Sequence, residues 1–179
     1  MPSQQGLLAC VLGTALLQAG CMGGKPVSGC SDGWYITGYF TPVEQDYPPE
    51  PRVAITTSDG QQHALPQAFV EAVKVEGWGK LAAGYYIGEY HNAWHTSSRP
   101  LDSQGNTLQI GSIATDKRKI PHGSTVTIPV LNNYTFTAND IGTSIKGKHI
   151  DIFCGEGRPG ELLTYRMTKK NVEVCVRLQ

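Results

Sequence analysis

The chain has 179 residues, among them 21 glycines and 11 prolines. This length suffices for one domain with a core, or for one domain with a large insertion, and the glycine and proline content favours short strands and turns over a helical bundle. Fifteen basic and fifteen acidic side chains give a formal net charge of zero, which argues against the positive field typical of proteins that bind nucleic acid.

Residues 1–21 have the features of an export segment. The apolar run at 6–20 is too short to span a bilayer comfortably and ends in small residues. Residues 17–21 resemble a bacterial lipobox, which predicts a lipid anchor on Cys21; the alternative is cleavage nearby and release. We therefore expect the protein in the periplasm, anchored to the outer membrane as a lipoprotein, or secreted. Residues 22–33 predict a flexible tether.

The first half of the folded part mixes strands with one helix. Residues 34–41 are aromatic and β-branched and predict a first strand, which ends at Pro42. A short strand is expected at 52–57 and a helix at 66–76, where Phe69, Val70 and Val73 form an apolar stripe and Gly77 suits the C-terminal cap. Residues 77–90 predict short strands interrupted by glycines, and residues 91–111 predict polar turns.

The second half predicts short strands at 110–115, 125–130, 134–138 and 149–153, and a closing strand at 172–178. One or two helical turns are expected at 160–167. No internal repeat is present.

Two aspartates dominate the stretch from 139 to 153. Asp140 ends one predicted strand, and Asp151 lies within the next, where Ile150 and Ile152 alternate with His149 and Asp151. If the isoleucines face a core, His149 and Asp151 share the opposite face. A carboxyl group held on a strand and partly desolvated has a raised pKa and suits a general acid.

Cysteine chemistry depends on the compartment. In an oxidising compartment we expect Cys154 to pair with Cys175, which would leave Cys30 unpaired; the alternative is three reduced thiols. His91 and His95 have the spacing of two zinc ligands on a helix, but Asn92 replaces the glutamate of the metalloprotease motif. We therefore expect no metal and no cofactor.

Several motifs together resemble the three-aspartate (3D) domain found in membrane-bound lytic transglycosylase A and related cell-wall proteins. These motifs are residues 114–116, 120–123, 140–147 and 149–153, together with Tyr39-Phe40-Thr41-Pro42 in the first strand. The resemblance implies a mainly β fold, a six-stranded double-psi β-barrel over residues 34–179, with a helix-containing insertion at about residues 50–108.

The same resemblance implies an activity: non-hydrolytic cleavage of the β-1,4 bond between N-acetylmuramic acid and N-acetylglucosamine in peptidoglycan. Asp151 would act as general acid and then base, giving a 1,6-anhydro product, and Asp140 would raise the pKa of Asp151 and stabilise positive charge. The expected substrate contacts are Lys146, Tyr39, Thr41 and Asp116, with Trp34 and Trp78 as further sugar platforms.

Other interpretations remain open for these residues. Asp140 also fits an Asx-type turn, Asp116 a structural role, and the aromatic residues a core. The whole chain could be a non-catalytic, expansin-like module that binds cell-wall polysaccharide, or an inverting hydrolase with two well-separated carboxylates. In each case the expected partner is a glycan strand and the expected state a monomer.

Overall fold

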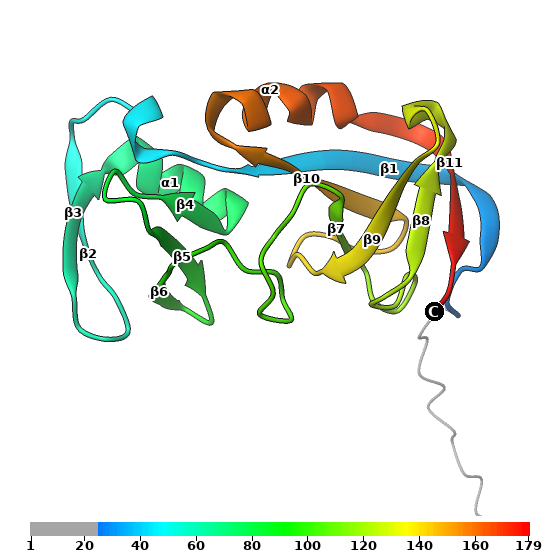
Figure 1. Ribbon diagram of the computed structural model, residues 1–179, viewed down its shortest axis with the longest axis horizontal. Helices are drawn as coiled ribbons and strands as arrows, with labels where there is room; N and C mark the ends of the chain where they lie inside the picture. Colours follow the sequence, from blue (N-terminus) through cyan, green and yellow to red (C-terminus); the bar gives the residue numbers. More distant parts are fainter. Residues whose placement is uncertain (1–24) are drawn as a thin grey trace, which may run out of the picture.

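The computed structural model describes residues 25–179 and contains a barrel and a smaller insertion, which lie end to end (Figure 1). The predicted export segment, Cys21 and the first part of the predicted tether lie outside the described residues. Within them, no helix has the length and apolar character needed to cross a membrane.

The barrel consists of six strands that close in the order β1-β10-β7-β9-β8-β11. Their bounds are β1 Gly29–Thr41, β7 Ser112–Thr115, β8 Thr125–Ile128, β9 Tyr134–Asp140, β10 His149–Glu156 and β11 Lys169–Arg177. The pairs β1–β10 and β7–β9 are parallel, and the remaining pairs are antiparallel. The predicted mainly β fold with a six-stranded barrel is confirmed.

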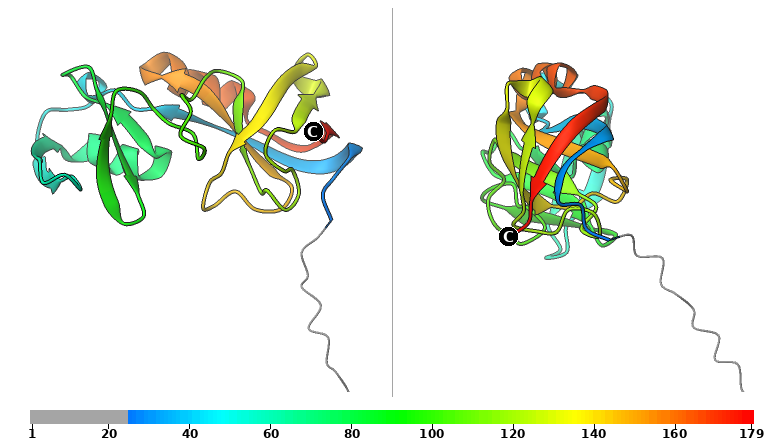
Figure 2. Two further views of the ribbon diagram at one scale, coloured as in Figure 1. Left: turned by 60° about the horizontal axis from the view of Figure 1, so that its bottom comes forward. Right: turned by 90° about the vertical axis from the view of Figure 1, so that its right-hand side faces the viewer.

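Alternating side chains fill the barrel interior. Ile150 and Ile152 of β10 are 0% and 2% exposed and point inward, as do Ile36 of β1 and Val174 and Val176 of β11. Two short 3-10 helices, η1 Glu44–Asp46 and η2 Pro129–Leu131, occur in the connections. Helix α2 (Gly157–Met167) packs on β1 and β10, with Leu163 and Met167 against the core (Figure 2).

The insertion joins β1 to β7. It contains the hairpin β2 (Arg52–Thr56) and β3 (Gln62–Pro66), helix α1 (Gln67–Glu76), and the sheet β4 (Trp78–Lys80), β5 (Tyr86–Tyr90) and β6 (Ala93–Ser97). Helix α1 buries Phe69, Val70 and Val73, the predicted apolar stripe, and ends at Gly77, whose φ of 93° suits glycine. Strand β6 corrects the expectation that 91–111 contains only turns.

The contacts between the barrel and the insertion include an apolar cluster and an ion pair. Tyr39 and Phe153 of the barrel pack against Trp78 and Tyr86 of the insertion, together with Leu108. Beside this cluster, Lys80 forms a salt bridge of 2.8 Å with Glu156, and the Tyr86 hydroxyl donates to the same carboxylate at 2.6 Å. These contacts fix the insertion against β10.

The start of the barrel differs from the prediction. Strand β1 begins at Gly29, because residues 29–34 pair with 172–176 of β11, so residues 29–33 are strand and not tether. That prediction was wrong because this part of β1 is polar and glycine-rich and gives no local strand signal.

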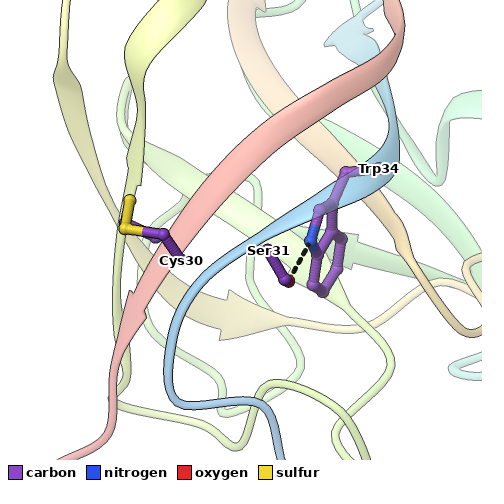
Figure 3. The surroundings of a disulfide bond; sticks show 4 residues. Cys30, Ser31 and Trp34 are labelled. Carbon is purple, nitrogen blue, oxygen red and sulfur yellow. Dashed lines mark hydrogen bonds between the residues drawn. A yellow bond between two sulfur atoms is a disulfide. The ribbon is translucent and has the colours of Figure 1, made fainter.

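The predicted Cys154–Cys175 disulfide is also wrong. Cys30 faces Cys175 across the antiparallel β1–β11 pair, with 3.9 Å between their Cα atoms, and these two residues form the disulfide (Figure 3). Cys154 lies on β10 with its side chain in the barrel core, and is a free thiol. Since Val174 and Val176 of β11 point into that core, Cys175 between them faces away from it.

Candidate active site

The candidate site lies on the outer face of β1 and β10. The parallel register of these strands places Tyr35 beside His149 and Thr37 beside Asp151. Because side chains alternate along a strand, the inward Ile150 and Ile152 leave His149 and Asp151 on the outer face, as the sequence pattern predicted.

Asp151 is partly exposed and held at one oxygen. Its Oδ1 accepts a hydrogen bond of 2.6 Å from the Thr37 hydroxyl, whereas its Oδ2 has no hydrogen-bond partner among residues 25–179. Burial raises the pKa of Asp151 above the usual aspartate value. The Thr37 hydrogen bond and nearby His149 oppose this shift, and the negative charge of Asp140 adds to it. The result is a carboxyl group with one anchored and one available oxygen and an increased tendency to hold a proton.

Asp140 lies two strands away from Asp151. Ala114 of β7 faces Asp151 on one side and Asp140 on the other, so two strand spacings, about 10 Å, separate the two aspartate Cα atoms. The Asp140 carboxylate accepts hydrogen bonds of 2.9 Å from the Tyr39 hydroxyl and from the Ser103 amide. Burial raises the pKa of Asp140, and these hydrogen bonds partly offset that effect. With both oxygens engaged, Asp140 can supply a fixed electrostatic influence more readily than a transferable proton.

Asp116 is buried, and both of its carboxylate oxygens accept hydrogen bonds from nearby turns. Arg118 forms a salt bridge of 2.8 Å with it, and the Gly147 amide donates to the same carboxylate at 2.9 Å. The Arg118 hydrogen bond is the main reason that the pKa of Asp116 lies well below its usual range. This geometry matches the structural alternative: Asp116 ties its turn to the turn that carries Gly147, and it has no oxygen free for a substrate.

The other predicted substrate contacts fall into two groups. Thr41 is 1% exposed, Trp34 0%, Trp78 8% and Tyr39 9%, so these residues are packed inside or between the two parts and offer no open sugar platform. These aromatic and β-branched side chains fill the barrel or the contact between the barrel and the insertion. Lys146 differs because it lies exposed on the loop from β9 to β10.

Two further polar groups near Asp151 were not among the predicted site residues. Thr37 contacts Asp151 directly. Glu76, at the end of α1, accepts a hydrogen bond of 3.1 Å from the Phe40 amide; burial, together with the charge of Asp151, raises the pKa of Glu76 to about 7. Nothing local distinguishes either residue in the sequence, since both contacts depend on long-range folding.

Tyr35 was also not among the predicted site residues. It is 37% exposed and stacks on His149, with 4.8 Å between ring centroids. Its place in the aromatic first strand was the available signal, but Trp34, Tyr39 and Thr41 of that strand were predicted as the substrate contacts instead. The pair forms an accessible aromatic surface two residues, about 6.6 Å, from Asp151 along both strands.

The groups that could suggest metal binding are already paired. Cys30, Glu173 and Cys175 bring three potential ligand atoms within 4.8 Å of one another, but both sulfurs belong to the disulfide. His95 lies in β6, with Nδ1 3.1 Å from the Ser58 hydroxyl and Nε2 3.3 Å from the Tyr90 carbonyl oxygen. These contacts occupy both ring nitrogens.

Comparisons with known proteins support the fold. Residues 111–174 match the family described as the 3D domain. The structure resembles that of E. coli MltA with bound chitohexaose, at a TM-score of 0.61 and 13% identity, over 84% of this chain and 76% of that chain. It also resembles a membrane-bound lytic murein transglycosylase from Agrobacterium tumefaciens, at a TM-score of 0.56 and 13% identity, over 80% and 73%. No curated protein matches the sequence.

At these identities the structural likeness establishes the fold alone. The barrel strands β7, β9 and β10, which carry or flank Asp151 and Asp140, lie inside the matched segment. The resemblance noted in the sequence is therefore confirmed: residues 111–174 match the 3D domain, within a fold similar to that of the MltA lytic transglycosylases.

Proposed function

We propose that this protein is a peptidoglycan lytic transglycosylase with Asp151 as its general acid and base. The observation that carries the proposal is the state of Asp151: a partly exposed carboxyl group on a barrel strand, with a raised pKa, one oxygen held by Thr37 and the other without a hydrogen-bond partner in the described part of the chain. A general acid needs a raised pKa and a free proton-bearing oxygen.

The proposed reaction has two proton transfers. The Oδ2–H of Asp151 protonates the glycosidic oxygen as the bond from that oxygen to C1 of N-acetylmuramic acid breaks, leaving an oxocarbenium-like centre. The resulting carboxylate then takes the proton of the C6 hydroxyl, and that oxygen closes onto C1. The products are a free 4-hydroxyl on N-acetylglucosamine and a 1,6-anhydro sugar, and Asp151 is again protonated. One carboxyl group suffices because the nucleophile belongs to the substrate.

Asp140 contributes through its charge in this proposal. Its carboxylate is fixed by Tyr39 and Ser103, so a preorganised negative charge lies on the same side of the molecule as the developing cation. The same charge raises the pKa of Asp151, which favours its protonated form before the reaction.

Substrate contacts are proposed on the exposed side of Asp151. Tyr35 and His149 present an aromatic surface of the kind on which a sugar ring packs, and Lys146 is free to pair with a lactyl or peptide carboxylate. Peptidoglycan lies outside the cytoplasm, so the activity also requires the export predicted for residues 1–21. The lipid anchor on Cys21 and the monomeric state are part of the same proposal.

The second candidate function is a non-catalytic module that binds cell-wall glycans. The apolar contact between barrel and insertion favours it, because Tyr39, Trp78 and Phe153 are buried there and cannot line a substrate site. A binding module would use the Tyr35 and His149 surface without needing the proton chemistry of Asp151.

The test is digestion of purified sacculi by the protein and by Asp151→Asn, with mass spectrometry of the soluble products. We expect 1,6-anhydro-muropeptides from the native protein and none from the variant, with both proteins sedimenting equally with sacculi. Binding without anhydro products from the native protein would support the binding module instead. Reducing ends that carry a hydroxyl from water would indicate a hydrolase.

A further inference from the structure

Three polar side chains on the outer face of β1 and β10 are linked by hydrogen bonds. The Thr37 hydroxyl donates to Asp151 Oδ1 at 2.6 Å, and the Thr37 hydroxyl oxygen lies 2.9 Å from His149 Nε2. The parallel register fixes this order, because Thr37 lies directly beside Asp151, and His149 is two residues away on the same strand as Asp151.

The number of protons available determines which group donates in each of these hydrogen bonds. A threonine hydroxyl has a single proton, and in Thr37 that proton is directed to Asp151. The contact with His149 must then run the other way, with a proton on Nε2 donated to the threonine oxygen. His149 therefore fixes the rotation of the Thr37 hydroxyl, and the hydroxyl fixes Oδ1 of Asp151.

The histidine ring is itself held in place. It stacks on Tyr35 at 4.8 Å between centroids and 26° between planes, and the Lys170 ammonium lies 5.6 Å from the Tyr35 ring. This packing limits rotation of the imidazole and keeps Nε2 directed at Thr37.

We propose that Thr37 and His149 are positioning residues for Asp151, with His149 acting through the Thr37 hydroxyl, so that Oδ1 is anchored and Oδ2 faces the glycan. The catalytic consequence rests on the function proposed above, whereas the orientation of Asp151 does not. Neither residue touches the reacting atoms in this assignment.

The effect of these hydrogen bonds can be measured as a change in the pKa of Asp151. Tyr39 of β1, Asp140 of β9 and Glu76 of α1 lie near enough to interact with its charge, and none of them donates a hydrogen bond to it. Thr37 favours the ionised form of Asp151 through its hydrogen bond, and His149 favours it through its charge. Breaking these hydrogen bonds should therefore raise the pKa of Asp151.

Two pairs of matched variants separate hydrogen bonding from shape. Thr37→Val keeps the shape of the side chain and loses the hydroxyl, whereas Thr37→Ser keeps the hydroxyl. His149→Phe keeps a ring to stack on Tyr35 and loses the N–H, whereas His149→Gln keeps an N–H donor. Thr37→Ala is a second variant without a hydroxyl, for use if valine impairs folding.

The main readout is the pKa of Asp151, measured by NMR from the carbon-13 shift of its carboxyl group. We expect an increase of about one unit in Thr37→Val and in His149→Phe, the size of one hydrogen bond to a charged group. Thr37→Ser should remain close to the native protein, and His149→Gln should shift the pKa of Asp151 less than His149→Phe, because it keeps the N–H donor and loses only the charge effect of the imidazole. The double variant Thr37→Val/His149→Phe should shift the pKa by less than the sum of the two single variants, because the part of the His149 effect that passes through the hydroxyl is already lost in Thr37→Val.

The second readout is turnover of sacculi, where we expect kcat to fall about tenfold in Thr37→Val and His149→Phe with KM changed by less than about twofold. An unchanged pKa of Asp151 in Thr37→Val and Thr37→Ala, or additive effects in the double variant, would overturn the inference. If the pKa pattern holds but the native protein makes no anhydro products, the positioning stands and the proposed activity fails. If native turnover depends on Asp151 but not on Thr37, the proposed activity stands and the positioning role of Thr37 fails.

Discussion

The Cys30–Cys175 disulfide should contribute a large part of the stability of the barrel. It joins residues separated by 145 positions and links β1 to β11. In the chain-entropy description, closing a loop of this length removes about 17 cal/mol/K from the unfolded chain, or about 5 kcal/mol at 25 °C. For a protein of this size that corresponds to a fall in Tm of about 10–20 °C when the bond is broken.

The assay is urea unfolding followed by tryptophan fluorescence, since Trp34 is fully buried in the barrel core. Native protein, native protein with dithiothreitol, and the variant Cys30→Ala/Cys175→Ala are compared. We expect the last two to lose similar stability, and dithiothreitol to have no further effect on the variant. Cys154→Ala is the control: it lacks a thiol of the core but should keep its sensitivity to dithiothreitol.

Two results would contradict this reasoning. One is a urea midpoint that dithiothreitol leaves unchanged. The other is a Cys154→Ala variant that no longer responds to dithiothreitol, which would mean that Cys154 takes part in the bond.

Three further predictions concern stability. Asp116→Asn should lower the free energy of unfolding by about 1–3 kcal/mol, because the ion pair with Arg118 is lost and the Gly147 amide keeps a poorer acceptor; thermal unfolding at pH 7 measures it, with Lys117→Gln in the same turn as the control. Glu76 has a folded-state pKa of about 7, above its unfolded value, so the folded protein binds more protons than the unfolded one between about pH 4.5 and 7 and loses stability as the pH rises through that window. Glu76→Gln should remove about 1–3 kcal/mol of that change in urea titrations at pH 5 and pH 8, and an equal pH dependence in both proteins would contradict the assignment. Gly79→Ala should destabilise by about 1–3 kcal/mol, since its Cβ would lie 2.6 Å from Phe69 Cζ in the insertion core, whereas Gly84→Ala would meet no atom within 4 Å and controls for the loss of glycine, apart from the cost of its positive φ.

Local patterns predicted much of this fold. The apolar stripe of α1 and the alternation in β10 are readable because helices and strands impose fixed periods on the side chains that face a core. The same alternation correctly placed His149 and Asp151 on one face. The closed six-stranded barrel was expected only from the resemblance to the 3D domain, because periodicity does not specify which strands are neighbours.

What could not be predicted depends on register between distant segments. Cys30 meets Cys175 and Thr37 meets Asp151 only because β1 lies between β10 and β11 with particular residues opposite one another. The burial of Tyr39 and Trp78 likewise depends on where the insertion packs. A single sequence contains no local mark of such pairings, so neither the burial of these aromatic residues nor the partner of Cys175 could be predicted.

Strand β10 carries His149 and Asp151 of the proposed site on one face and the core residues Ile150 and Ile152 on the other, so a change that moves one set also moves the other. Deleting Ile150 would move Asp151 and the residues after it by one position along the strand, so that Asp151 would point toward the barrel interior and Ile152 away from it. Charge would then enter the core while isoleucine moved to the surface. Length changes in this strand should therefore prevent the barrel from folding.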